Sequence, residues 1–404
     1  MSMRLKAAVI GTSAVLVLFA VLGGLGVRAA SGEGAYRQLS VYSEVLSRIR
    51  SEYVEEPNMS QVTDGALHGL LESLDANSGY LNPSEYRQYK LRKTDGKGGL
   101  GATLSKRFGY VAVVAVIPGG PAEKAGVENG DIIEAIEGRS TRDMSLAEVR
   151  NLMPGELGST INLTVVRARR SEPQRVTVTR DLVRLPAVTE RMLEDGIGYV
   201  KVQALPAGKA AEVAAHIRSL ERAGARSLLL DLRNASEGEQ AEGVAVANLF
   251  LDRGVITYLE GQKYARETFT ADPEKAVTRL PLVVLVNRGT AGAAEIVAAA
   301  ILENARGDVV GSKTFGIGSV QKLIEIPDGS ALILSIAKYY SPGGKAIQDV
   351  AVTPSVQVAD ARDELEVSEE EVEEGPAPDR SPGPQEDEPL RRAIELLRSR
   401  QQKA

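Results

Sequence analysis

The hydrophobic pattern of the chain opens with an unbroken apolar run. Residues 7–27 have no polar face, follow Arg4 and Lys6, and form a stretch about long enough to cross a bilayer. Positive charge ahead of such a run keeps that end in the cytoplasm and directs the rest of the chain to the other side. We therefore expect residues 1–30 to be a membrane anchor or a cleaved signal peptide, with the remainder in the periplasm or at the cell surface.

Helical and strand-like spacing of apolar residues then alternate along the chain. Residues 36–92 show helical spacing, 96–182 form short strand patterns between glycine turns, and 183–358 alternate strands with helices. Residues 359–389 are acidic, rich in proline and poor in apolar side chains, so we expect a disordered spacer there. Helical spacing returns in residues 390–404, where we predict a C-terminal helix.

The composition excludes several kinds of chemistry. Cys is absent, and the two His residues, His68 and His216, do not have the spacing of a zinc site. We therefore expect no Ser-His-Asp triad, no metal site and no cofactor. A formal net charge of -6 and the lack of a basic stripe argue against nucleic acid as a partner.

Glycine-rich turns mark the strand-rich stretch as a binding module. A Gly-Gly-Leu-Gly-Ala loop at 98–102, a Pro-Gly-Gly-Pro-Ala turn at 118–122 and a Gly-Asp-Ile-Ile element at 130–133 resemble those of a PDZ domain. Such a domain would hold the terminal carboxylate of a peptide on backbone N–H groups and add the peptide as a strand. The residues that the resemblance implies in this role are Gly99, Leu100, Gly101, Ala102, Leu146 and Val149.

Nearly the whole chain after residue 30 resembles the carboxyl-terminal processing peptidases. The motifs that carry the resemblance include Leu-Asp-Leu-Arg at 230–233, Thr-Phe-Gly at 314–316 and Tyr-Tyr-Ser-Pro-Gly-Gly at 339–344. Members of this family cut proteins near their carboxyl ends with a serine-lysine dyad. The resemblance implies an α/β (α+β) peptidase-homologue core, an inserted β-rich PDZ domain and an N-terminal helical segment.

The residues that perform catalysis in that family are replaced in this sequence. The attacking serine corresponds to Gly292, and the lysine that takes its proton corresponds to Ile317. Gln321 is retained at the position of the glutamine that helps orient the lysine. Glu237 stands where a glycine N–H of the family would face the oxyanion, and a carboxylate there would repel the developing negative charge. We therefore assign no catalytic residue and expect an inactive member.

These features predict a membrane-tethered, non-catalytic homologue that binds protein C-termini through its PDZ domain, as an adaptor or regulator. Its expected partners are protein or peptide C-termini and an active peptidase relative, and we expect a homo- or hetero-oligomer. Two alternatives stay open. The chain could be an active peptidase with a displaced dyad, for which Thr290 and Lys313 are the nearest candidates. It could also be a structural envelope protein whose PDZ groove is unused.

Overall fold

The computed structural model describes residues 37–91, 97–107, 109–167, 172–359 and 387–401. The expected anchor and nearly all of the expected acidic spacer lie outside these ranges. Within them, no helix is both long and apolar enough to span a membrane. The chain divides into two compact units, residues 1–67 and 68–404.

The first unit is helical where it is described. Residues 37–52 form a helix that exposes Leu39 and Val45. After a short break, α2 (Met59–Glu72) begins in this unit and ends in the second. The predicted N-terminal helical segment is thereby confirmed.

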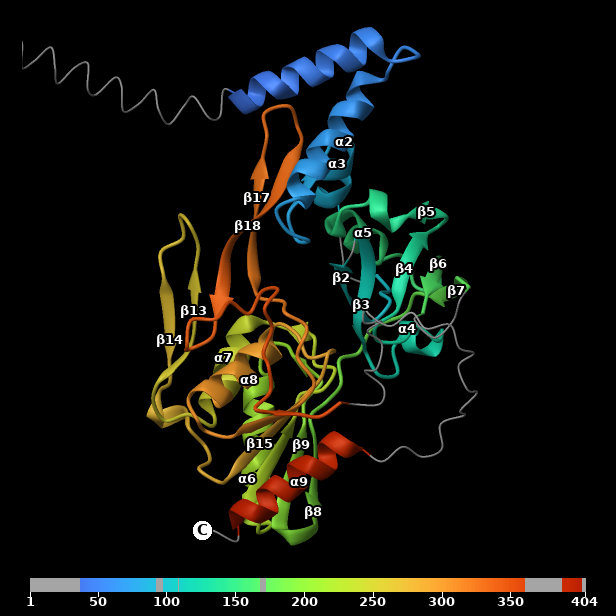
Figure 1. The fold of residues 1–404 in the computed structure, drawn as a ribbon. Helices are drawn as coiled ribbons and strands as arrows, with labels where there is room; N and C mark the ends of the chain where they lie inside the picture. Colours follow the sequence, from blue (N-terminus) through green and yellow to red (C-terminus); the bar gives the residue numbers. More distant parts are fainter. Residues whose placement is uncertain (1–36, 92–96, 108, 168–171, 360–386, 402–404) are drawn as a thin grey trace, which may run out of the picture. The chain divides into compact units, whose positions relative to one another are not determined.

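A five-stranded antiparallel sheet with one short added strand forms the PDZ region (Figure 1). Its elements are β2 (Ala102–Arg107), β3 (Tyr110–Val116), β4 (Ile132–Ile136), β5 (Arg139–Ser140), β6 (Thr160–Val166), β7 (Gln174–Thr179), α4 (Pro121–Lys124) and α5 (Leu146–Leu152). Alternation along β6 buries Ile161, Leu163 and Val165 and leaves the residues between them more exposed, as expected for a sheet with one covered face. The Ser145 side chain caps α5 by accepting the N–H of Glu148.

A second sheet, mostly parallel, forms the centre of the peptidase-like core. Its order is β19-β16-β15-β11-β9-β8, and only β8 runs antiparallel to its neighbour. The strands are β8 (Thr189–Leu193), β9 (Ile197–Lys201), β11 (Ser227–Asp231), β15 (Leu282–Val286), β16 (Asp308–Gly311) and β19 (Val356–Gln357). Every residue of β11 and β15 is buried, because helices cover both faces.

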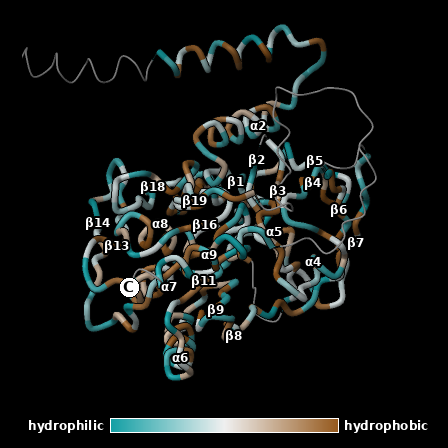
Figure 2. Tube along the Cα trace, turned by 60° about the horizontal axis from the view of Figure 1, so that its bottom comes forward, coloured by the Kyte–Doolittle hydropathy of each residue, from teal (hydrophilic) through white to brown (hydrophobic). Residues whose placement is uncertain are grey.

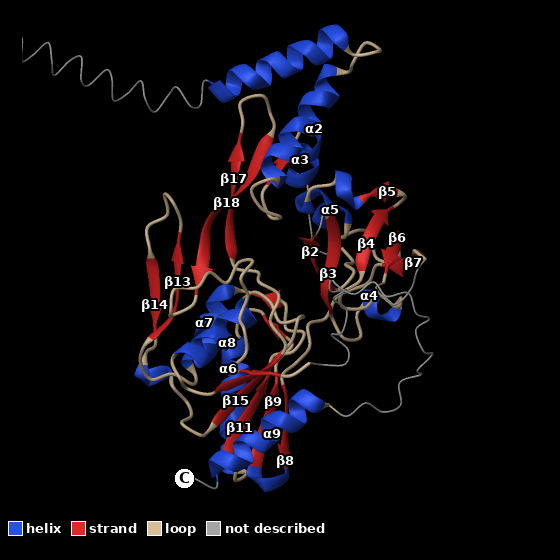
Figure 3. Ribbon diagram, viewed as in Figure 1, coloured by secondary structure: helices blue, strands red, loops and turns tan. Residues whose placement is uncertain are grey.

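Three helices pack on one face of this sheet and one on the other. The first face is covered by α6 (Lys209–Arg222), α7 (Gln240–Asn248) and α8 (Ala293–Glu303). Brown and teal residues alternate along α6, as expected for a helix that buries one side (Figure 2). On the opposite face, α9 (Glu388–Gln401) buries Ala393 and Leu397 against β9, β11, β15 and β16 (Figure 3).

Smaller elements complete the second unit. A further sheet joins β1 (Gly79–Leu81), β13 (Val255–Glu260), β14 (Glu267–Thr270), β17 (Ser319–Glu325) and β18 (Ala331–Tyr340), with α3 (Pro83–Lys90) beside β1. A two-stranded parallel pair joins β10 (Ala204–Leu205) to β12 (Glu237–Gly238). The predicted architecture of peptidase-like core, PDZ domain and helical segment is confirmed.

Candidate functional site

Gly292 lies in a sharp turn between β15 and α8. Asn287 holds this turn, because its side-chain oxygen accepts the N–H of Gly289 at 3.1 Å and that of Asn234 at 2.9 Å. Gly292 has φ 62° and ψ -119°, a backbone conformation that residues with a side chain rarely adopt. A Cβ built at Gly292 would have no heavy atom beyond its chain neighbours within 4 Å. The space that a Cβ would occupy is therefore open.

Glu295, completely buried in α8, connects Gly292 to the segment that carries Ile317. One carboxylate oxygen accepts the N–H groups of Gly292 at 2.9 Å and Ile317 at 2.8 Å. The other accepts the N–H of Gly316 and the hydroxyl of Thr314. Burial raises the pKa of Glu295 to about 7, although these four hydrogen bonds lower it. The two positions that correspond to the family dyad are thus held side by side by one carboxylate.

The sequence alone did not predict this role of Glu295. A glutamate three residues after a helix N-cap commonly bonds back to the N-cap N–H, and that local signal predicts the bond to Gly292. The bonds to residues 314–317 are long-range, and no sequence pattern indicated them.

At the lysine position, the structure places an apolar side chain and an amide engaged elsewhere. Ile317 is half-buried in the loop that leads into β17. Gln321 lies on β17 and donates from Nε2 to the hydroxyl of Ser319 at 2.7 Å and that of Ser335 at 3.4 Å. Neither side chain can accept the proton of a nucleophile in the way a neutral lysine would.

Glu237 makes a contact that the sequence did not predict. Its Oε1 accepts the hydroxyl of Thr103 at 2.7 Å, and Thr103 Oγ1 also lies 2.6 Å from the hydroxyl of Ser236. Thr103 belongs to β2 of the PDZ region, whereas Ser236 and Glu237 belong to the loop after β11 in the core. The loop that would stabilise an oxyanion in the family therefore binds the PDZ region here.

A buried network of ion pairs and hydrogen bonds lies at the end of β11, just before that loop. Asp231 is fully buried and receives hydrogen bonds from Arg233 and, at 2.7 Å, from the hydroxyl of Tyr199. Arg233 also pairs with Asp387, immediately before α9, at 2.7 Å. Burial, reinforced by the charge of Asp231, raises the pKa of Tyr199. The network fixes the start of the loop to β9 and to α9.

The residues considered for a displaced dyad have structural surroundings. Thr290 is fully buried, and its hydroxyl donates to the Leu232 carbonyl at 2.9 Å while accepting the N–H of Asn287. Lys313 is exposed. Across the described ranges, no three His, Asp or Glu side chains gather in a way that could hold a metal ion.

The residues predicted to hold a peptide lie together at the start of β2 and on α5. Gly101 has φ 72°, which glycine adopts readily, and Gly99 exchanges backbone hydrogen bonds with Asp181. The other four are buried in the PDZ core or packed against it: Leu100, Leu146, Val149 and Ala102. Their role in peptide binding remains a prediction.

Comparison with known proteins defines the class to which this fold and site belong. The model of peptidase family S41 matches residues 196–358, and the PDZ domain model matches residues 113–167. The carboxy-terminal-processing protease of Bartonella bacilliformis is 31% identical over 331 residues, which cover 81% of this chain and 76% of that protein. The carboxyl-terminal-processing protease of Synechocystis sp. is 34% identical over 314 residues, 76% of this chain and 73% of that protein.

A solved structure agrees with these relatives. The photosystem II D1 C-terminal processing protease superposes with a TM-score of 0.66 at 28% identity, covering 79% of this chain and 92% of that one. The chain therefore belongs to the carboxyl-terminal processing protease family, within peptidase family S41.

Proposed function

We propose that this protein binds carboxyl termini of other proteins through its PDZ domain and does not cleave them. The observation that carries the proposal is the pair Gly292 and Ile317, which replaces the nucleophile and the base within an otherwise matching family scaffold. A glycine has no atom that can attack a carbonyl, and an isoleucine cannot accept a proton. The buried, hydrogen-bonded state of Thr290 gives no support to a displaced nucleophile.

The proposed setting is extracytoplasmic, with the chain tethered through residues 1–30. Arg4 and Lys6 ahead of the apolar run support this orientation. In this setting the protein acts as an adaptor or regulator, either presenting C-termini to an active peptidase relative or shielding them, and it associates with copies of itself or with that relative.

The test measures binding and cleavage on the same samples. The full chain in detergent is incubated with a library of peptides that have free carboxyl termini, and bound and cleaved peptides are identified by mass spectrometry. We expect selective binding with every bound peptide intact. Cleavage that survives repurification and disappears in Lys313→Ala or Thr290→Ala would refute the proposal, and an absence of any binding would favour a structural role.

A reconstructed site provides the positive control. The triple variant Gly292→Ser, Ile317→Lys and Glu237→Gly restores the serine, the lysine and the glycine of the family pattern. A Cβ at residue 292 meets no heavy atom within 4 Å, so the serine has room there, although the positive φ strains the backbone. If this variant cuts peptides that the native chain only binds, the lost activity is assigned to the replaced residues.

A further inference from the structure

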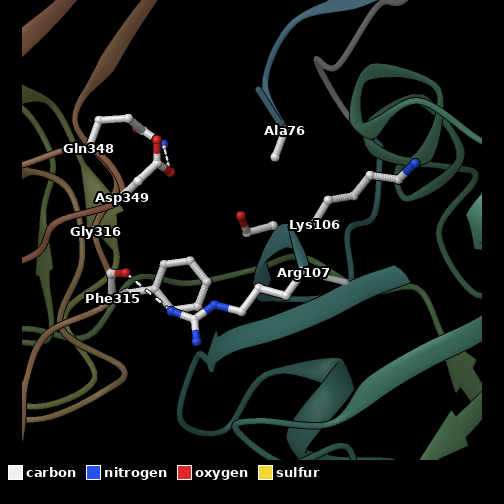
Figure 4. A pocket seen from close by; sticks show the side chains of 8 residues that line it. Ala76, Lys106, Arg107, Phe315, Gly316, Gln348 and Asp349 are labelled. Carbon is white, nitrogen blue, oxygen red and sulfur yellow. Dashed lines mark hydrogen bonds between the residues drawn. The ribbon is translucent and has the colours of Figure 1, made fainter. Parts of the chain in front are cut away.

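A pocket of about 280 Å³ lies apart from the residues predicted to hold a peptide on the PDZ domain (Figure 4). Its walls come from β2 at 105–107, from 315–316, from 348–349 and from Ala76. The PDZ region and the peptidase-like core therefore both contribute. Its volume is near the lower end for small-molecule sites, enough for the last one or two residues of a peptide.

Arg107 presents a positively charged group that is held in place on the wall of this pocket. Its guanidinium lies 4.3 Å from the centre of the Phe315 ring, and one N–H group donates to the Phe315 carbonyl at 3.3 Å. Figure 4 shows the two side chains in contact. Stacking and a single hydrogen bond leave most of its five N–H donors unused, and among the described residues no carboxylate pairs with Arg107.

Ser105 supplies a second hydrogen-bond donor on the wall of this pocket. The residue is only 7% exposed, lines the pocket, and within the described part of the chain its hydroxyl has no hydrogen-bond partner. Its oxygen is not one of the buried side-chain atoms that lack a partner, so the hydroxyl is open to the pocket. It is therefore free to donate a hydrogen bond to a ligand atom there.

The charges around the pocket favour an anion. Lys106 is paired with Glu72 at 2.7 Å, so these two charges offset each other. Asp349 is the acidic residue of the lining, and Lys338 lies 3.8 Å from its carboxylate. The remaining charge is that of Arg107.

We infer that this pocket is a second binding site, which takes the carboxylate of a peptide. Arg107 and Ser105 donate hydrogen bonds to the carboxylate, and the Phe315 ring and the Ala76 methyl group contact an adjoining apolar side chain. The inference rests on the proposed function only in taking peptides as the ligands. The carboxylate can be the chain terminus or an acidic side chain, and the test separates these sources.

The test is isothermal titration of the full chain in detergent with three matched peptides. The first has an apolar last residue and a free carboxyl terminus, the second is its C-terminal amide, and the third is an amide with an internal glutamate. With the first peptide we expect two sites in the native chain. In Arg107→Gln and in Ser105→Ala, one of the two should weaken, by about tenfold to a hundredfold for the arginine, because hydrogen bonds between charged groups are strong.

Arg175→Gln is the matched control, since Arg175 is an exposed arginine on β7 of the same region. It should bind like the native chain. Phe315→Leu removes the ring on which the Arg107 guanidinium stacks but keeps the arginine and its charge. Comparing it with Arg107→Gln separates the effect of a less firmly held arginine from the effect of losing the contact between arginine and carboxylate.

The outcomes distinguish failure of the second site from failure of the proposed function. One site that none of these variants alters overturns the second site and leaves the proposed function intact. Binding of the glutamate peptide alone, lost in Arg107→Gln, supports the pocket while the proposed function fails. Absence of binding by all three peptides overturns both.

Discussion

Replacing Gly292 with alanine tests whether the turn at the start of α8 keeps a strained conformation. At φ 62° and ψ -119°, a residue with a Cβ is held outside its favoured regions, at a cost of about 1–3 kcal/mol. The methyl group itself meets no heavy atom within 4 Å, so neither a clash nor new packing adds to this cost. Alanine also restricts the unfolded chain, which returns about 0.4–1 kcal/mol. We expect a net destabilisation of about 0.5–2 kcal/mol, measured as a shift of the urea midpoint.

Gly208→Ala is the matched control in the same core. Gly208 also has open space around a Cβ, but with φ 86° and ψ -4° it lies near the left-handed helical region, which side chains tolerate better. The Gly292 variant should therefore be the less stable of the two. If Gly292→Ala is neutral, or is more stable than Gly208→Ala, residue 292 does not retain a strained turn in solution.

Three further changes probe other parts of the core. Because burial raises the pKa of Glu295 to about 7 from 4.5, the folded state holds its proton more tightly; the resulting stabilisation is complete below pH 4.5 and is lost as pH rises through 7. Compared with the Glu295→Gln variant, the native chain should therefore lose up to about 3 kcal/mol of its free energy of unfolding as the pH rises from 4.5 through 7. A difference in stability between the two proteins that does not change with pH would contradict this. Thr103→Val should speed proteolysis between the PDZ region and the core, whereas the exposed Thr179→Val should not. Leu397→Ala should cost about 2–5 kcal/mol in urea unfolding, against almost nothing for the exposed Arg392→Ala.

The fold was predictable because its signals are local or repetitive. Apolar strands such as β15, helical spacing along α6 and the glycine turns of the PDZ region each depend on a few neighbouring residues. The C-terminal helix was predicted by its spacing, but its docking partner was not. That partner is a sheet face assembled from four strands far apart in the sequence, and spacing along one helix does not identify it.

The candidate site was predictable only at the level of single positions. Alignment of motifs identified Gly292 and Ile317, but it did not show that one oxygen of Glu295 binds both backbone N–H groups. The bonds from Thr103 to Ser236 and Glu237 span more than a hundred positions along the chain. Contacts of this kind depend on how two domains pack, and the sequence carries no periodic signal for them.

The pattern of kept and replaced residues separates the scaffold from the chemistry. Glu295, Asp231 and Arg233 are buried, and each makes several hydrogen bonds, so their loss would leave buried donors or charges unsatisfied. At the replaced positions, in contrast, the catalytic side chains of the family would lower the stability of the fold. A side chain at residue 292 would strain the turn, and a neutral lysine at residue 317 would have to lose its hydration. Catalytic groups of this kind cost stability that only turnover justifies. The proposed function, binding without cleavage, therefore accounts for their absence, while the carboxylate of Glu295 holds the two segments together.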